Sequence, residues 1–126
     1  MGTRALTFVY ENHAPLVNIY TQYDGYPSGH GLELAKILKD RVLVNGISDP
    51  LQENASNGMG CLAATIVAKL KTGIGGVYLY SLRDRDAGQD YEYHIYKDQV
   101  VVKDHYKNIN IFDGTWNEFY EFCMKD

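Results

Sequence analysis

The stretch Thr3-Arg-Ala-Leu-Thr-Phe-Val-Tyr10 sets the fold class, because it is rich in the β-branched and aromatic residues that strands favour. A second run of the same kind occupies residues 16–23, after a polar segment from Glu11 to Pro15. A connection of about five residues is typical of an antiparallel hairpin. We therefore predict that strands at 3–10 and 16–23 pair as a hairpin.

The middle of the chain predicts two helices. The first begins near Gly31 and closes at Asn45-Gly46, two residues that tolerate positive φ. The second begins after Asn57 and is the most apolar segment of the chain. Both show apolar residues at steps of three and four. The first stripe contains Leu32, Ala35, Leu38 and Val42, and the second contains Met59, Leu62, Ala63, Ile66, Val67 and Leu70.

The remainder predicts three strands and one helix. The strands fall at 77–82, 90–97 and 100–105, and Thr115-Trp-Asn-Glu118 has the form of a capping box that starts a last helix. The element order is then ββααβββα, which is typical of an α+β domain. We predict one domain over residues 1–126, with an antiparallel sheet of about five strands and three helices on one face.

Charge and composition exclude several function classes. The net charge is −4, from 12 basic and 16 acidic residues, and no basic stripe appears. A protein that binds a nucleic acid polymer normally carries such a stripe. We therefore do not expect a nucleic acid polymer as a partner. A ligand with one or two phosphates remains compatible, because a few backbone N–H groups can hold it.

The two cysteines, Cys61 and Cys123, form no zinc or redox spacing, and both fall in apolar helix patterns, so we expect core thiols. The four histidines lack metal spacing, and we expect neither a metal nor a cofactor. No segment reaches transmembrane length, and the start lacks a signal-peptide pattern. These features predict a cytoplasmic protein without a membrane partner.

A short glycine-rich segment precedes each of the first two predicted helices. The start of a helix leaves backbone N–H groups without partners and carries a partial positive charge, so it can hold an anion. Two such starts would hold two phosphates of one ligand. The alternative is that the glycines only allow close packing and that Ser or Asn caps each helix. The candidate residues are Ser28, Gly29, His30 and Gly31, and Asn57, Gly58, Met59 and Gly60.

In Tyr23-Asp24-Gly25-Tyr26, an aspartate lies between two tyrosines, just before the first glycine-rich segment. Tyr23 and Tyr26 can stack on a base, and Asp24 can accept from a base or a ribose. The alternative is a turn in which Asp24 caps the backbone. Arg4, on the face of its strand that carries Leu6, would clamp a phosphate or pair with Asp24. Tyrosine is in excess, with 11 copies against 4 Phe, and strand composition explains most of it.

A third candidate lies on the hairpin at 90–105. If Asp98 and Gln99 form its turn, Glu92 faces His105 and His94 faces Lys103, all on one sheet face. Glu92, His94 and His105 would then serve as a general base with its orienting group. The alternative is ordinary cross-strand pairing on a solvated face, which needs no function.

Three stretches resemble a family of small phage-encoded and bacterial proteins of largely unassigned function. They are Met-Gly-Thr-Arg at 1–4, Tyr-Asp-Gly-Tyr-Pro-Ser-Gly-His-Gly at 23–31 and Asn-Gly-Met-Gly-Cys-Leu-Ala-Ala at 57–64. The resemblance implies a viral source and little about chemistry. Small phage proteins of this size include sponges that sequester cyclic nucleotide signals of host immunity.

The sequence thus favours non-catalytic binding of a small phosphate-bearing ligand, with a phage anti-defence sponge for a cyclic nucleotide as its most concrete form. One alternative is a small hydrolase or nucleotide-cleaving enzyme, and another is a structural or interaction module. A tyrosine-rich sheet edge and composite sites would suit a homo-oligomer.

Overall fold

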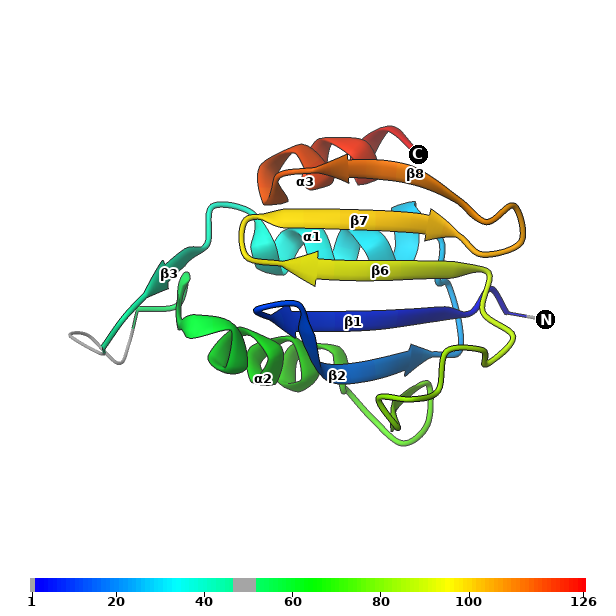
Figure 1. Ribbon diagram of the computed structural model, residues 1–126, viewed down its shortest axis with the longest axis horizontal. Helices are drawn as coiled ribbons and strands as arrows, with labels where there is room; N and C mark the ends of the chain where they lie inside the picture. The colour runs from blue at the N-terminus through cyan, green and yellow to red at the C-terminus, as the bar shows by residue number, and fades with distance from the viewer. Residues whose placement is uncertain (1, 47–51) are drawn as a thin grey trace.

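A central hairpin and four later strands build one six-stranded sheet, as seen in the computed structural model, which describes residues 2–46 and 52–126 (Figure 1). The strand order is β5-β2-β1-β6-β7-β8. Neighbouring strands are antiparallel except for β1 and β6, which are parallel. The strands are β1 (Ala5–Glu11), β2 (Ala14–Thr21), β5 (Val77–Tyr80), β6 (Tyr91–Tyr96), β7 (Gln99–Asp104) and β8 (Ile109–Gly114).

Three α-helices lie on one face of this sheet in the described part of the chain, behind the strands in Figure 1. They are α1 (Leu32–Leu38), α2 (Gly58–Leu70) and α3 (Trp116–Lys125), and the π-helical turn η1 (Pro27–Gly31) leads into α1. A short parallel pair, β3 (Val42–Val44) and β4 (Ala55–Asn57), stands apart from the sheet and precedes α2. The architecture is therefore α+β with a mostly antiparallel sheet.

The main core fills the space between the sheet and the helices. Alternate strand residues point into it, as the period of two requires. From the sheet it takes Ala5, Val9, Ile19, Tyr93 and Ile95, and from the helices Leu34, Leu38, Leu62, Ile66, Phe119 and Cys123. The capping box of α3 forms as predicted, with Glu118 N donating to Thr115 Oγ1 at 3.1 Å and Thr115 N donating to Glu118 Oε1 at 2.8 Å.

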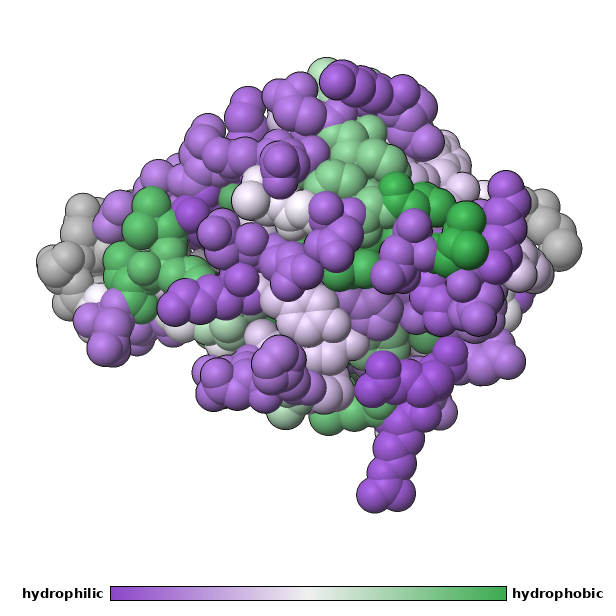
Figure 2. Space-filling model, turned by 45° about the horizontal axis from the view of Figure 1, so that its top comes forward, coloured by the Kyte–Doolittle hydropathy of each residue, from purple (hydrophilic) through white to green (hydrophobic). Residues whose placement is uncertain are grey.

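The opposite face of the sheet carries a second, smaller cluster, formed by Leu6, Phe8, Tyr10 and Tyr20. The connection between β5 and β6 lies against it. The Arg85 guanidinium lies 4.5 Å from the centre of the Phe8 ring, and Asn18 Nδ2 donates to the carbonyls of Ser81 and Asp84. The connection therefore shelters the side chains beneath it, on a face where the described residues place no helix. Figure 2 shows a further group of apolar side chains at the position of β3, beside the grey residues.

Several predicted boundaries were wrong. The first hairpin turns through two residues, Asn12 and His13, both with positive φ, and its connection is not five residues long. The first helix ends at Leu38, because Lys39 is extended and Asp40 has a φ of 58°. Val42 therefore lies in β3. The strands β3, β4 and β8 were missed, and the sheet has six strands where about five were expected.

The second hairpin has a different register from the predicted one. Its turn is Lys97-Asp98, and Glu92 pairs with Lys103, whereas the sequence suggested His105. The buried Cys123 fits the expectation of a core thiol, but Cys61 is exposed on α2, which contradicts it.

Candidate functional site

The two glycine-rich helix starts lie at opposite ends of α2. Gly58 and Met59 line a cavity at the start of α2. Ser28, Gly29 and His30 line another, together with residues from the end of the same helix. A helix of 13 residues is roughly 20 Å long. One small ligand therefore does not reach both starts, and the predicted two-phosphate grip is wrong in this form.

The backbone N–H groups of the first start already have partners within the chain. Ser28 N donates to Asp126 Oδ2 at 3.0 Å, and Gly29 N donates to the Tyr26 carbonyl at 2.9 Å. His30 N donates to the Asp24 carbonyl at 2.7 Å. Since these donors are used, and α1 has only seven residues, this start offers no anion site.

Glycine at the first start is explained by close packing. A Cβ on Gly31 would lie 3.2 Å from Cys123 Sγ and 3.2 Å from the Tyr93 ring, and a Cβ on Gly29 would collide with the Asp24 carbonyl. The packing part of the alternative therefore fits Gly29 and Gly31, whereas no side chain caps this helix start.

The second cavity, of about 340 Å³, collects the predicted residues Tyr23, Asp24, Ser28, Gly29 and His30. Asp24 has a φ of 57° and weakly accepts from the Tyr26 hydroxyl at 3.4 Å, while 58% of Tyr23 is exposed. Lys69 is the cation of this cavity, but Asp24 and Glu33 are also there, and so is the C-terminal end of α2. That end carries partial negative charge, so the cavity disfavours a phosphate.

His30 is a buried neutral side chain in the core. Its Nε2 lies 2.7 Å from Thr7 Oγ1, and its Nδ1 lies 3.5 Å from Thr21 Oγ1. Burial lowers the pKa of His30 to about 4. Two hydroxyls thus satisfy the ring where no charge is tolerated.

Arg4 does not pair with Asp24 in the described structure, and its contact with a phosphate stays a prediction. Its backbone N–H donates to Asp90 Oδ2 at 2.9 Å. Its guanidinium lies beside Gly88, with Nη1 3.0 Å from where a Cβ on that glycine would stand. Among the described residues, its side chain makes no ion pair with Asp24.

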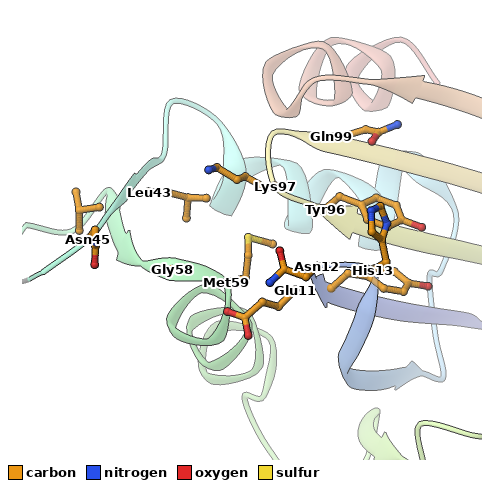
Figure 3. Close-up of a pocket in the computed structure, with 12 residues that line it drawn as sticks. Glu11, Asn12, His13, Leu43, Asn45, Gly58, Met59, Tyr96, Lys97 and Gln99 are labelled. Atoms are coloured by element: carbon orange, nitrogen blue, oxygen red, sulfur yellow. The ribbon is translucent and has the colours of Figure 1, made fainter.

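The start of α2 opens into the larger cavity, of about 500 Å³, shown in Figure 3. Gly58 has a φ of 79°, and a Cβ on Gly60 would meet no atom within 4 Å. Asn57 does not cap the helix, because its Oδ1 accepts from Gly46 N at 2.9 Å. The first turn contains no acidic residue. Among the described residues, no side chain caps the positive end of α2 and no acid lies in its first turn.

Four segments form the walls of this cleft. The end of β1 and the turn after it contribute Glu11, Asn12 and His13, and the turn after β6 contributes Lys97. Because β1 and β6 are parallel, their carboxyl ends meet at one edge of the sheet, as at many ligand sites. In Figure 3, the labelled side chains of Leu43, Met59, Asn12 and Lys97 surround the same gap. The stacked rings of Tyr10 and Tyr96, with centroids 4.4 Å apart, form another part of the lining.

The sequence did not identify most of this cleft. Met59 and Gly58 were among the predicted residues, but Tyr10, His13, Leu43 and Lys97 were not. The two turns give a weak signal by themselves, and only the parallel pairing of β1 with β6 places them together.

The third candidate, around Glu92, does assemble. Glu92 Oε1 lies 3.1 Å from His94 Nε2, and Oε2 lies 2.9 Å from His105 Nδ1 and 3.0 Å from Gln89 Nε2. Burial raises the pKa of Glu92, but hydrogen bonds and the charge of His94 outweigh burial and lower it to about 2. The carboxylate is therefore ionised at neutral pH. His94 Nδ1 also lies 2.6 Å from the Tyr10 hydroxyl.

Within residues 2–46 and 52–126, no group of three or more His, Cys, Asp or Glu side chains is arranged to hold a metal ion. No helix in the same ranges has the length and hydropathy needed to cross a membrane. In comparisons with protein-family models, with curated proteins and with solved structures, no match to this chain was found.

Proposed function

We propose that the protein binds a small phosphate-bearing ligand, without converting it, in the cleft at the start of α2. The observation that carries this proposal is that an uncapped helix start opens into a cavity of about 500 Å³. Cavities of roughly 300–1,000 Å³ are typical of small-molecule sites. The N–H groups at the helix start would take the phosphate.

The charges around the cleft favour an anion there over the second cavity. In the cleft, one cation, Lys97, stands against one acid, Glu11, and the His13 ring adds an N–H donor. The second cavity has one cation against two acids, at the negative end of α2. A phosphate group at the start of α2 therefore meets the positive end of the helix and fewer acidic side chains than in the second cavity.

The rest of the lining suits the body of a nucleotide. Met59 and Leu43 offer apolar surface, and the Tyr96 ring offers a stacking face. Combined with the sequence resemblance, this supports a phage anti-defence sponge that sequesters a cyclic nucleotide in the host cytoplasm. A homo-oligomer would be compatible with it.

Binding is measured by isothermal titration with inorganic phosphate, 3′,5′-cyclic AMP, a cyclic dinucleotide and a cyclic ADP-ribose isomer. The bound compound is then released by proteolysis and identified by mass spectrometry. Recovery of the intact ligand in a fixed ratio to protein supports sequestration. A converted ligand supports an enzyme, and no uptake of any compound leaves the interaction-module alternative.

Lys97→Glu should weaken binding at least ~10-fold, because a charge-assisted contact becomes a repulsive one. Asn12→Asp should also weaken it, because it adds a negative charge to the lining of the cleft. Lys107→Glu, an exposed charge reversal in the turn between β7 and β8, is the matched control. Normal affinity in both cleft variants would exclude the start of α2 as the site.

A further inference from the structure

The cluster around Glu92 has hydrogen bonds of defined direction. An ionised carboxylate only accepts, so each nitrogen bonded to it must carry a hydrogen. His94 Nε2 and His105 Nδ1 therefore each carry a hydrogen. Gln89 donates a third hydrogen bond to the same carboxylate. Glu92 is thus held by three donors and fixes the tautomer of both histidines.

His94 has no nitrogen left for chemistry. Its Nε2–H is given to Glu92, so its Nδ1 accepts from the Tyr10 hydroxyl at 2.6 Å. The ring stacks on Phe8, with centroids 5.3 Å apart and planes 7° from parallel. Of the three residues that the sequence suggested for catalysis, His94 is therefore a supporting residue.

His105 differs from His94 in its second nitrogen. With Nδ1–H given to Glu92, the neutral ring has its lone pair on Nε2. The side chain is 29% exposed, and Nε2 lies 4.0 Å from Asp86 Oδ1. A carboxylate that orients the Nδ1–H of an imidazole, and leaves Nε2 free, is the arrangement of a general base and its positioning residue.

We propose that His105 is a general base for the hydrolysis of an uncharged carboxylic ester, with Glu92 as its positioning residue. Nε2 takes a proton from water while the water oxygen forms a bond to the acyl carbon. The carbon–oxygen bond to the leaving group then breaks, and the imidazolium returns its proton to the leaving alcohol. Ester and water thus give acid and alcohol, and His105 is regenerated.

The charges that face His105 select the substrate class. Glu92 comes from β6 and Asp86 from the connection between β5 and β6. Both stabilise the imidazolium formed during the reaction. Asp86, which is 83% exposed at its side chain, stands where a substrate would approach and repels phosphodiesters and carboxylates. An ester without charge meets no such barrier. This site lies outside the cleft, so its test is independent of phosphate binding.

The test uses p-nitrophenyl acetate and follows nitrophenolate release across pH. We expect the protein to exceed the same concentration of free imidazole by at least ~10-fold, since a positioned base typically contributes more than this. His105→Asn keeps an N–H donor for Glu92 but has no basic nitrogen, so it should fall to the imidazole-free background. Lys107→Ala, an exposed substitution in the same turn as His105, should retain the full rate.

Glu92→Gln should lower the rate at least ~10-fold and move the midpoint of the pH–rate profile to lower pH, because the imidazolium loses a negative neighbour. A merely structural role would not move that midpoint. Thermal unfolding and circular dichroism confirm that each variant is folded. A wild-type rate no higher than that of free imidazole, or an unchanged rate in folded His105→Asn, would overturn the proposal.

Discussion

The buried Glu92 carboxylate should dominate the loss of stability in acid. Its pKa falls from an ordinary value of 4.5 to about 2 in the folded protein. When folding lowers the pKa of a carboxyl group, the ionised group stabilises the fold. This stabilisation is fully present at pH values above the pKa of the unfolded state, and it is lost as the pH falls through the pKa of the folded state. The window is therefore about pH 4.5 to 2, and the difference corresponds to ~3 kcal/mol.

The physical reason is that burial opposes the charge while the hydrogen bonds from His94, Gln89 and His105 favour it more strongly. The side chain is 12% exposed, so solvent screening is limited.

Urea unfolding of the wild type and Glu92→Gln at several pH values between 7 and 2 measures this contribution. The variant should be less stable by ~2–3 kcal/mol at pH 5–7, and the two proteins should converge towards pH 2. A stability difference that stays constant from pH 5 to pH 2 would refute the reasoning, because it would show that the charge of Glu92 is not what stabilises the fold.

Three further predictions concern the glycines and the thiols. Gly60→Ala should raise the free energy of unfolding by ~0.5–1 kcal/mol, since it adds helix propensity in open space, and denaturant unfolding showing a loss would contradict this. Gly31→Ala should instead lower it by ~1–3 kcal/mol, because the new Cβ would press on Cys123 and Tyr93, and an unchanged midpoint would argue against tight packing there. A thiol reagent should label Cys61 rapidly and Cys123 only on unfolding, because burial raises the pKa of Cys123 to about 12; rapid labelling of both in the native protein would disprove it.

Local patterns in the sequence predicted local structure well. The capping box at Thr115 and Glu118 and the apolar stripe of α2 involve neighbours along the chain, so tertiary contacts did not alter them. The first helix was predicted too long because Val42 follows Leu38 at a helical step, although the backbone has already left the helix at Lys39. Ile109 and Ile111 alternate as a strand should, and β8 was missed despite that signal.

The outcome for the candidate sites depended on distant parts of the chain. Ser28 was predicted to offer its N–H to a ligand, but Asp126, from the other end of the chain, accepts that hydrogen bond. The cluster of Glu92 and His105 survived a register error of two residues, because a shift by two keeps every side chain on the same face of a sheet. The two residues therefore meet diagonally, where a shift by one would have separated them.

The parallel pairing of β1 with β6 also has a consequence for how the chain folds. The hairpin of β1 and β2 and the meander from β6 to β8 each form from nearby residues, whereas Ala5 meets Tyr91 only by closing most of the chain into a loop. Contacts between distant residues form slowly, because closing the loop costs chain entropy before the contacts contribute any stabilising free energy. Substitutions at the β1–β6 junction should therefore slow refolding most, while those within either half should mainly speed unfolding.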